Sequence, residues 1–124
     1  MTSNIGIGEA RAFHEGMAAV RIGPENTARW GYVDEFGKLA IKPQFGIDVF
    51  QSGPNPVTEA YMYDAARDFS EGLAAVQFSA HHWGFVDKAG TTVIDGPFDV
   101  ANSFHEGLAA VKDAKTGKWG FIRR

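Results

Sequence analysis

The chain has 124 residues, 44% of them hydrophobic, which suits one domain with a packed interior. Its net charge of −3 disfavours nonspecific binding to nucleic acid or anionic membranes, and the absence of cysteine excludes disulfides, thiolate metal sites and cysteine nucleophiles. No run approaches the roughly 18 apolar residues of a membrane span, and the first residues lack a secretory signal pattern. The sequence therefore predicts a cytoplasmic protein that is not bound to membranes.

One phrase of eight residues occurs three times. It reads Phe-His-Glu-Gly-Met-Ala-Ala-Val at Phe13, Phe-Ser-Glu-Gly-Leu-Ala-Ala-Val at Phe69 and Phe-His-Glu-Gly-Leu-Ala-Ala-Val at Phe104. Each phrase is followed by a Trp-Gly-aromatic-aliphatic segment, and these segments begin at Trp30, Trp83 and Trp119. Such recurrence predicts a repeat architecture, in which each unit buries its apolar face against its neighbours.

The spacing of the phrases sets the boundaries of the units. Phe104 follows Phe69 by 35 positions, whereas Phe69 follows Phe13 by 56. Most of the excess lies between Phe45 and Phe69, so residues 46–63 are interpreted as an insertion. The single repeat domain, residues 1–124, then contains two full units and an incomplete one, at about 10–45, 66–98 and 101–122.

Residues within a unit alternate with the period of β-strands. Between Leu73 and Phe78 the even-numbered side chains, including Val76, are predicted on one face and the odd-numbered ones, including Gln77, on the other. Both faces are mostly apolar or small. This pattern is typical of a strand that is buried on both sides.

The Trp-Gly segment and the turn after it predict two further strands. Trp83 and Phe85 share one face, and Gly84 leaves the other face open to close approach. Asp87 then starts a tight turn that ends at Gly90, a residue free to adopt positive φ. Each unit is predicted to be a three-stranded antiparallel meander. The whole chain is predicted to be all-β, as an open solenoid-like array or a small barrel-like closure.

These motifs closely resemble the bacterial WG-repeat family, also called KWG repeats. The resemblance rests on the Phe-x-Glu-Gly-Leu-Ala-Ala-Val phrase, the Trp-Gly-Phe-Val-Asp segment, the glycine turn, and the Val-Ile and Phe-Asp that follow. Lys118 precedes Trp119 as in the Lys-Trp-Gly signature, whereas Arg29 and His82 stand at that position in the other units. The resemblance to this family implies a β-rich repeat array with a binding or scaffolding role, and it supplies no catalytic residues.

The four histidines were the candidates for a metal or acid/base site. His14 and His105 share one position of the phrase and each precedes a Glu, and imidazole with carboxylate suits both chemistries. Equivalent positions in a stacked array are, however, a whole repeat apart. We expect turn positions instead, with each Glu accepting hydrogen bonds from turn amides. His81 and His82 are neighbours before a strand, where adjacent side chains point to opposite faces.

No catalytic motif points to an enzyme. The sequence lacks a GxxxxGK[ST] phosphate loop, a G-x-S-x-G elbow and an H-E-x-x-H zinc pattern, so no enzyme activity, catalytic residue, metal or cofactor is predicted. The tryptophans and repeated phenylalanines are expected to form the core rather than a platform for ligands.

The insertion contains the residues most particular to this chain. Its aromatic and acidic side chains are candidates for a patch that docks a basic protein. These partner-binding candidates are Asp48, Phe50, Glu59, Tyr61, Met62 and Tyr63. The alternative, which the sequence leaves open, makes residues 57–63 an extra strand that covers an exposed sheet edge.

The leading functional expectation is a non-catalytic protein-binding module, for example a bacterial immunity, inhibitor or adaptor protein with a basic partner. The alternative is recognition of a small molecule or glycan by exposed aromatics between the repeats. Incomplete terminal units leave strand edges, so a homo-oligomer paired through those edges is a further expectation.

Overall fold

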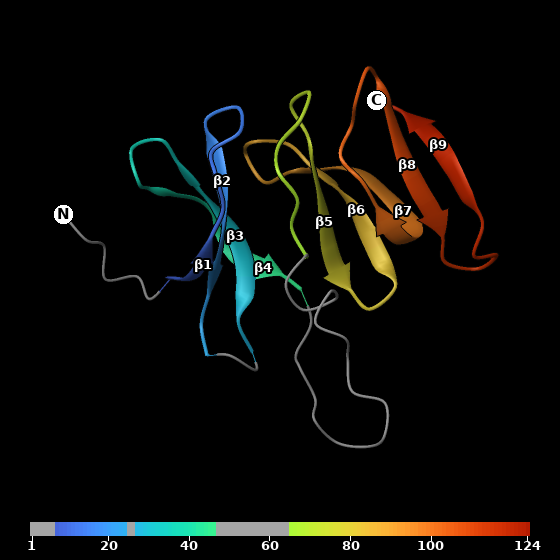
Figure 1. Cartoon of the computed structure of the whole chain (residues 1–124). Coiled ribbons are helices and arrows are strands. Elements are labelled where there is room, and N and C mark those ends of the chain that lie inside the picture. The colour runs from blue at the N-terminus through green and yellow to red at the C-terminus, as the bar shows by residue number, and fades with distance from the viewer. Residues whose placement is uncertain (1–6, 25–26, 47–64) are drawn as a thin grey trace.

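The computed structural model describes residues 7–24, 27–46 and 65–124, which form two antiparallel sheets (Figure 1). The first sheet has the order β1 (Ile7–Ala10), β2 (Met17–Ile22), β3 (Arg29–Asp34) and β4 (Leu39–Phe45). The second has the order β5 (Ala74–Ser79), β6 (His82–Val86), β7 (Thr92–Ala101), β8 (Leu108–Asp113) and β9 (Trp119–Arg123). The described part of the chain contains no helix, and therefore none that would span a membrane.

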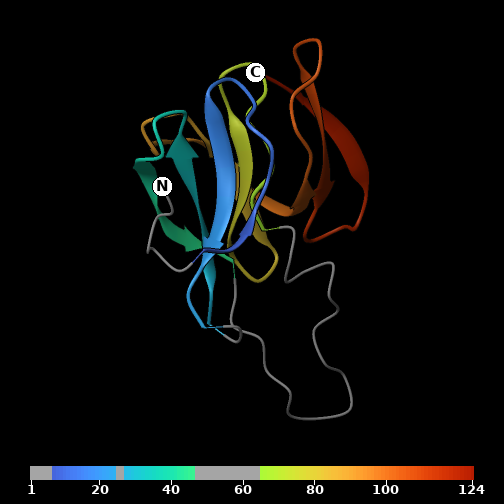
Figure 2. The same ribbon diagram turned by 60° about the vertical axis from the view of Figure 1, so that its left-hand side comes forward.

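The strands follow chain order in each sheet, which confirms the predicted antiparallel meanders. β2–β3–β4 form the first unit and β5–β6–β7 the second, whereas the third has only β8 and β9. β7 joins the last two units, since residues 92–98 pair with β6 and residues 98–101 pair with β8. The sheets lie side by side without closing into a barrel, so the open array is the arrangement adopted (Figures 1 and 2).

The turns between the second and third strands of the units form as predicted. The Asp87 carboxylate accepts hydrogen bonds from the backbone N–H groups of Ala89 (2.9 Å) and Thr91 (3.0 Å). Gly90 closes this turn at a φ of 85°, in the left-handed region that favours glycine. Asp34 binds the corresponding amides of its own turn.

β5 is buried on both faces, and its two faces belong to different hydrophobic clusters, as the alternation predicted. Val76 packs in the cluster that joins the first unit to the second, and Ala75 in the cluster that joins the second to the third. The large side chains that the first unit contributes are Met17, Trp30, Tyr32, Ile41 and Phe45. Each core is therefore shared between neighbouring units.

The tryptophans do not share one environment. Trp30 and Trp83 are buried, which confirms the core prediction for both, but Trp119 is 56% exposed and the prediction is wrong there. The reason is that each buried tryptophan is covered by the unit that follows, and no described residue covers β9. Gly84 confirms the predicted close approach, because a Cβ there would lie 2.7 Å from the Phe78 ring and would overlap the Ile94 carbonyl.

Candidate functional site

The three phrases form three similar turns at one edge of the molecule. In each, the residue before the Glu exchanges backbone hydrogen bonds with the residue after the Gly. Every turn places its Glu in the left-handed region, at φ values of 55°, 55° and 53° for Glu15, Glu71 and Glu106. The turns lie in a row along the upper edge of Figure 1, and we call this arrangement of residues 13–16, 69–72 and 104–107 the turn row.

The first two Glu residues of the turn row each reach the following turn. The Glu15 carboxylate accepts hydrogen bonds from the backbone N–H groups of Glu71 (2.8 Å) and Gly72 (2.9 Å). The Glu71 carboxylate accepts one from Gly107 (2.9 Å). The prediction that these acids accept turn amides is confirmed, but the amides belong to the following unit. Among the described residues, the Glu106 carboxylate has no hydrogen-bond or ion-pair partner.

Aromatic rings pack across the same boundaries. The ring centroids of Tyr32 and Phe69 are 4.9 Å apart, and those of Phe85 and Phe104 are 4.8 Å apart. Tyr32 also donates its hydroxyl to the Arg67 carbonyl (2.6 Å), and burial raises the pKa of Tyr32 far above its usual value, so the phenol remains a neutral donor. A ring from one unit thus covers the phrase phenylalanine of the next.

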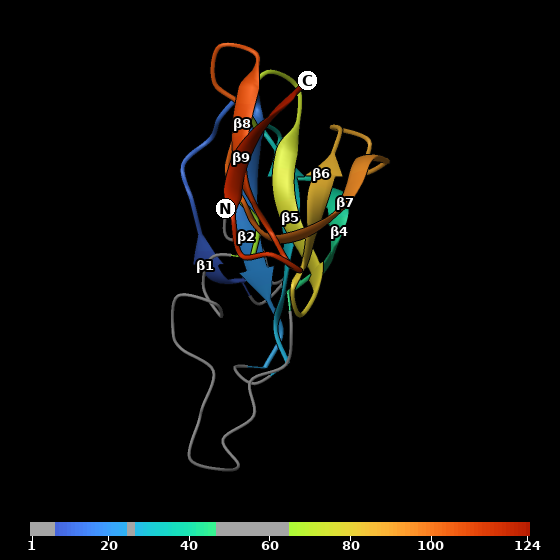
Figure 3. The same cartoon turned by 90° about the vertical axis from the view of Figure 1, so that its right-hand side faces the viewer.

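The last unit exposes the side chains that the other units bury. Phe121 has the position of Tyr32 and Phe85 but is 74% exposed, and Leu108 is also exposed although its counterpart Leu73 is buried. With Trp119 these residues form an apolar surface on β8 and β9, which we call the tail face. Figure 3 shows β8 and β9 at the front when the molecule is viewed from this end.

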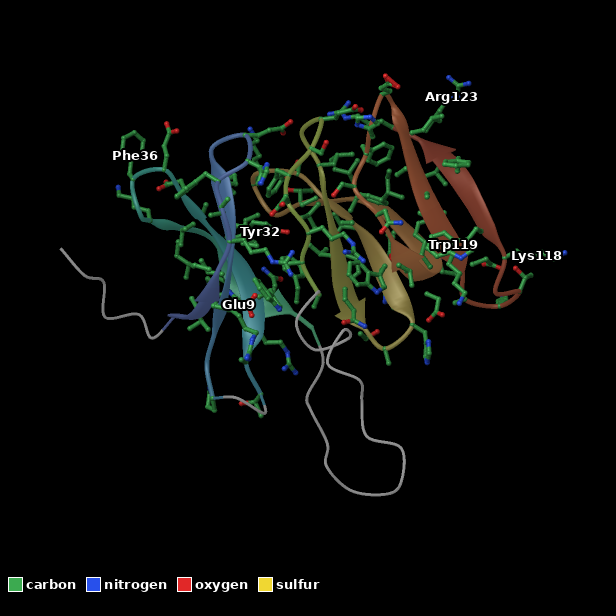
Figure 4. The ribbon with its side chains drawn as sticks, viewed as in Figure 1. Glu9, Tyr32, Phe36, Lys118, Trp119 and Arg123 are labelled. Carbon is green, nitrogen blue, oxygen red and sulfur yellow. The ribbon has the colours of Figure 1, made fainter. Side chains whose placement is uncertain are left out.

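Cations outnumber acids in the segment that carries the tail face. Residues 108–124 contain one acid, Asp113, whose pKa is lowered by hydrogen bonds from the Thr116 hydroxyl and amide. Figure 4 shows Lys118, Trp119 and Arg123 at the opposite end of the molecule from Phe36. The cations of this segment are Lys112, Lys115, Lys118, Arg123 and Arg124.

Three of the four histidines each contact a different aspartate. His14 contacts Asp68 (3.2 Å), and His82 contacts Asp95 (2.6 Å) on another hairpin. His81, at a φ of 59°, faces Asp99 instead. Within the described ranges no group of three or more His, Asp or Glu side chains is placed to hold a metal ion.

The partner-binding candidates of the insertion lie outside the described residues. They are Asp48, Phe50, Glu59, Tyr61, Met62 and Tyr63. The tail face was missed because every aromatic of the repeat was assigned to the core. The signal for it in these 124 residues is the third unit, which contains two of the three strands of a unit.

The repeat phrases and their stacking agree with a comparison to known families. A family model described as a WG containing repeat matches residues 30–46, 55–79 and 83–119, which is more than half of the chain. No curated protein and no solved structure matches. The chain belongs to the WG-repeat family.

Proposed function

We propose that this protein is a non-catalytic protein-binding module, of the kind that serves as a bacterial immunity, inhibitor or adaptor protein. The observation that carries the proposal is the tail face, where Leu108, Trp119 and Phe121 are exposed together. Clustered apolar side chains on a surface mark interaction sites, and aromatic residues ringed by polar ones are the usual anchors of protein interfaces.

The charge of the chain suggests two kinds of contact. The cations around the tail face favour an acidic segment of a partner there. The acids of the insertion, Asp48 and Glu59, favour a basic partner, as the sequence predicted. These two surfaces are compatible with one partner of mixed charge or with separate partners.

A small-molecule site is the second candidate function. It is favoured by a pocket of about 330 Å³ that opens between the start of β5 and β7, lined by Leu73, Val93, Ile94 and Arg123 among others. Trp30 and Trp83 are buried between the units, so exposed tryptophan for a glycan is confined to Trp119.

Capture of a partner from a bacterial lysate, followed by titration with that protein in purified form, tests the proposal. The baits are the intact chain, a Phe121→Ser variant, and a matched Phe36→Ser variant, because Phe36 is equally exposed but lies away from the tail face. We expect one protein that binds the intact chain and the Phe36 variant but not the Phe121 variant.

A fourth bait, with residues 46–63 replaced by a short Gly-Ser turn, tests the insertion separately. Loss of the partner from this bait alone would place the site on the insertion. If no protein depends on either surface while all baits remain folded, the protein-binding proposal is wrong and the pocket becomes the leading site.

A further inference from the structure

We infer that the tail face of one copy receives the first turn, residues 13–16, of a second copy, so that chains associate head to tail. This inference rests on the proposed protein-binding role of the tail face and names its partner. It is distinct from association through strand edges, because the contact is a repetition of the stacking between units.

Among the described residues, the first and last units each contain one ring of the contact between units without its counterpart. Inside the chain, Tyr32 covers Phe69 and Phe85 covers Phe104, and both phrase phenylalanines are buried. Phe121 stands at the covering position, is 74% exposed and has no ring packed on it among the described residues. Phe13 stands at the covered position and is 52% exposed. The two free halves of this contact are therefore complementary.

The hydrogen bonds of the turn row are also left half-made. Glu15 and Glu71 each accept from amides of the following turn. Glu106 has the same backbone conformation, and its carboxylate has no partner within the described part of the chain. The backbone N–H groups of Glu15 and Gly16 likewise have no acceptor there. A head-to-tail contact joins this free acceptor to these free donors, in a charge-assisted hydrogen bond.

The distribution of charge favours unlike ends. Residues 108–124 have five cations and one acid, yet the whole chain has a net charge of −3, so the remaining residues are strongly negative. A symmetric dimer would bring two cationic tail faces together, which costs energy. A head-to-tail contact instead places the cationic end against residues 1–45 of another copy, which have five acids and five cations and therefore no net charge.

The contact is small, because part of the first unit is already covered. Ala18, Val20 and Val33 form their own buried cluster, which leaves the first turn as the accessible counterpart of the tail face. Small interfaces are weak, so we expect association that depends on concentration. A heterologous contact of this kind adds further copies unless the rotation closes a ring.

Sedimentation velocity of the intact chain, from micromolar to millimolar concentration, tests the inference. We expect the average mass to rise above the 13.5 kDa of one chain. Phe13→Ser and Phe121→Ser should each remain monomeric, and Phe36→Ser should behave as the intact chain does. Glu106→Ala should weaken association by about tenfold, the loss of one hydrogen bond to a charged acceptor. Unchanged circular dichroism and melting temperature show that the variants fold.

An equimolar mixture of the Phe13→Ser and Phe121→Ser variants is the decisive sample. One variant retains the tail face and the other retains the first turn, so the mixture should form a species of twice the monomer mass that cannot grow further. No arrangement through identical surfaces predicts this result.

Three outcomes overturn the inference. A Phe13→Ser variant that associates as well as the intact chain indicates a symmetric contact between tail faces. Association that neither serine variant changes indicates pairing of strand edges. An intact chain that stays monomeric throughout shows that the second copy is not the partner, and the proposed function then still stands if Phe121→Ser loses a captured protein.

Discussion

The Glu71 carboxylate accepts a hydrogen bond from the backbone N–H of Gly107, across the boundary between the second and third units (2.9 Å). Glu15 makes the equivalent bonds one unit earlier. The acid of the Phe-x-Glu-Gly phrase therefore links neighbouring repeats, beside the ring contacts of Phe69 and Phe104 across the same boundaries.

Glu71→Ala should destabilise the protein by about 1 to 3 kcal/mol, because it removes a charged acceptor and leaves the Gly107 amide unpaired. Glu106→Ala is the matched control, since Glu106 has the same φ but no partner in the described part of the chain; its effect should stay within about 0.5 kcal/mol. Urea unfolding of both variants measures the difference. Equal losses of stability would show that the turn itself, and not the contact between units, requires the Glu.

Trp83→Ala should cost about 3 to 5 kcal/mol, as expected for a large buried aromatic side chain. Trp119→Ala, at the same repeat position but exposed, should change the free energy of unfolding by less than about 1 kcal/mol. Thermal and urea unfolding at low protein concentration, where chains do not associate, are the measurements. A Trp83 variant with an unchanged melting temperature would contradict its place in the core.

Gly84→Ala should be strongly destabilising, whereas Gly120→Ala should be tolerated. A methyl group at Gly84 would meet the Phe78 ring and the Ile94 carbonyl, and relief of such overlap costs typically about 1 to 3 kcal/mol or more. At Gly120 the same group has no neighbour within 4 Å. Chemical denaturation of the pair decides whether the Trp-Gly pairing is required by packing; similar stabilities would show that it is not.

Gln77→Met should stabilise the protein by about 1 to 3 kcal/mol, because neither side-chain polar atom of this fully buried residue has a hydrogen-bond partner among the described residues. Methionine has a similar length and no amide to desolvate. Gln44→Met, on the exposed side of β4, should have little effect and serves as the control. A loss of stability in the Gln77 variant would contradict this expectation and show that the Gln77 amide is hydrogen-bonded in the folded protein.

The Asp113 carboxylate should stabilise the fold most at pH values above the ordinary pKa of an aspartate. Its pKa is lowered in the folded state by Thr116, so the favourable contribution is present at neutral pH and is lost as the pH falls through the folded value. Thr116→Val removes the hydroxyl bond and should move the carboxyl titration of Asp113 upward, as followed by NMR. An unchanged titration would show that the hydroxyl does not hold the carboxylate.

The strands and turns of the repeat unit could be predicted from the sequence, because they depend on residues that are close together in the chain. Alternation along the Leu73 strand predicted which side chains face which neighbour, since strand geometry fixes direction at every second residue. Asp87 and Gly90 predicted the turn, and Gly84 the close approach, because these depend on residues near in the chain. The repetition of the phrase was sufficient to predict stacked all-β units.

Only the tertiary structure decided which surface of each unit is covered. Trp83 and Trp119 are each followed by Gly-Phe, yet one is buried and the other exposed, because burial depends on the unit that follows in space. Glu71 and Glu106 differ in the same way. Their φ values are nearly equal, but the Glu71 carboxylate accepts a hydrogen bond from the next unit, whereas the Glu106 carboxylate has no partner among the described residues. The sequence by itself determined the repeat and its strands, and the stacking determined which surfaces of the array are exposed.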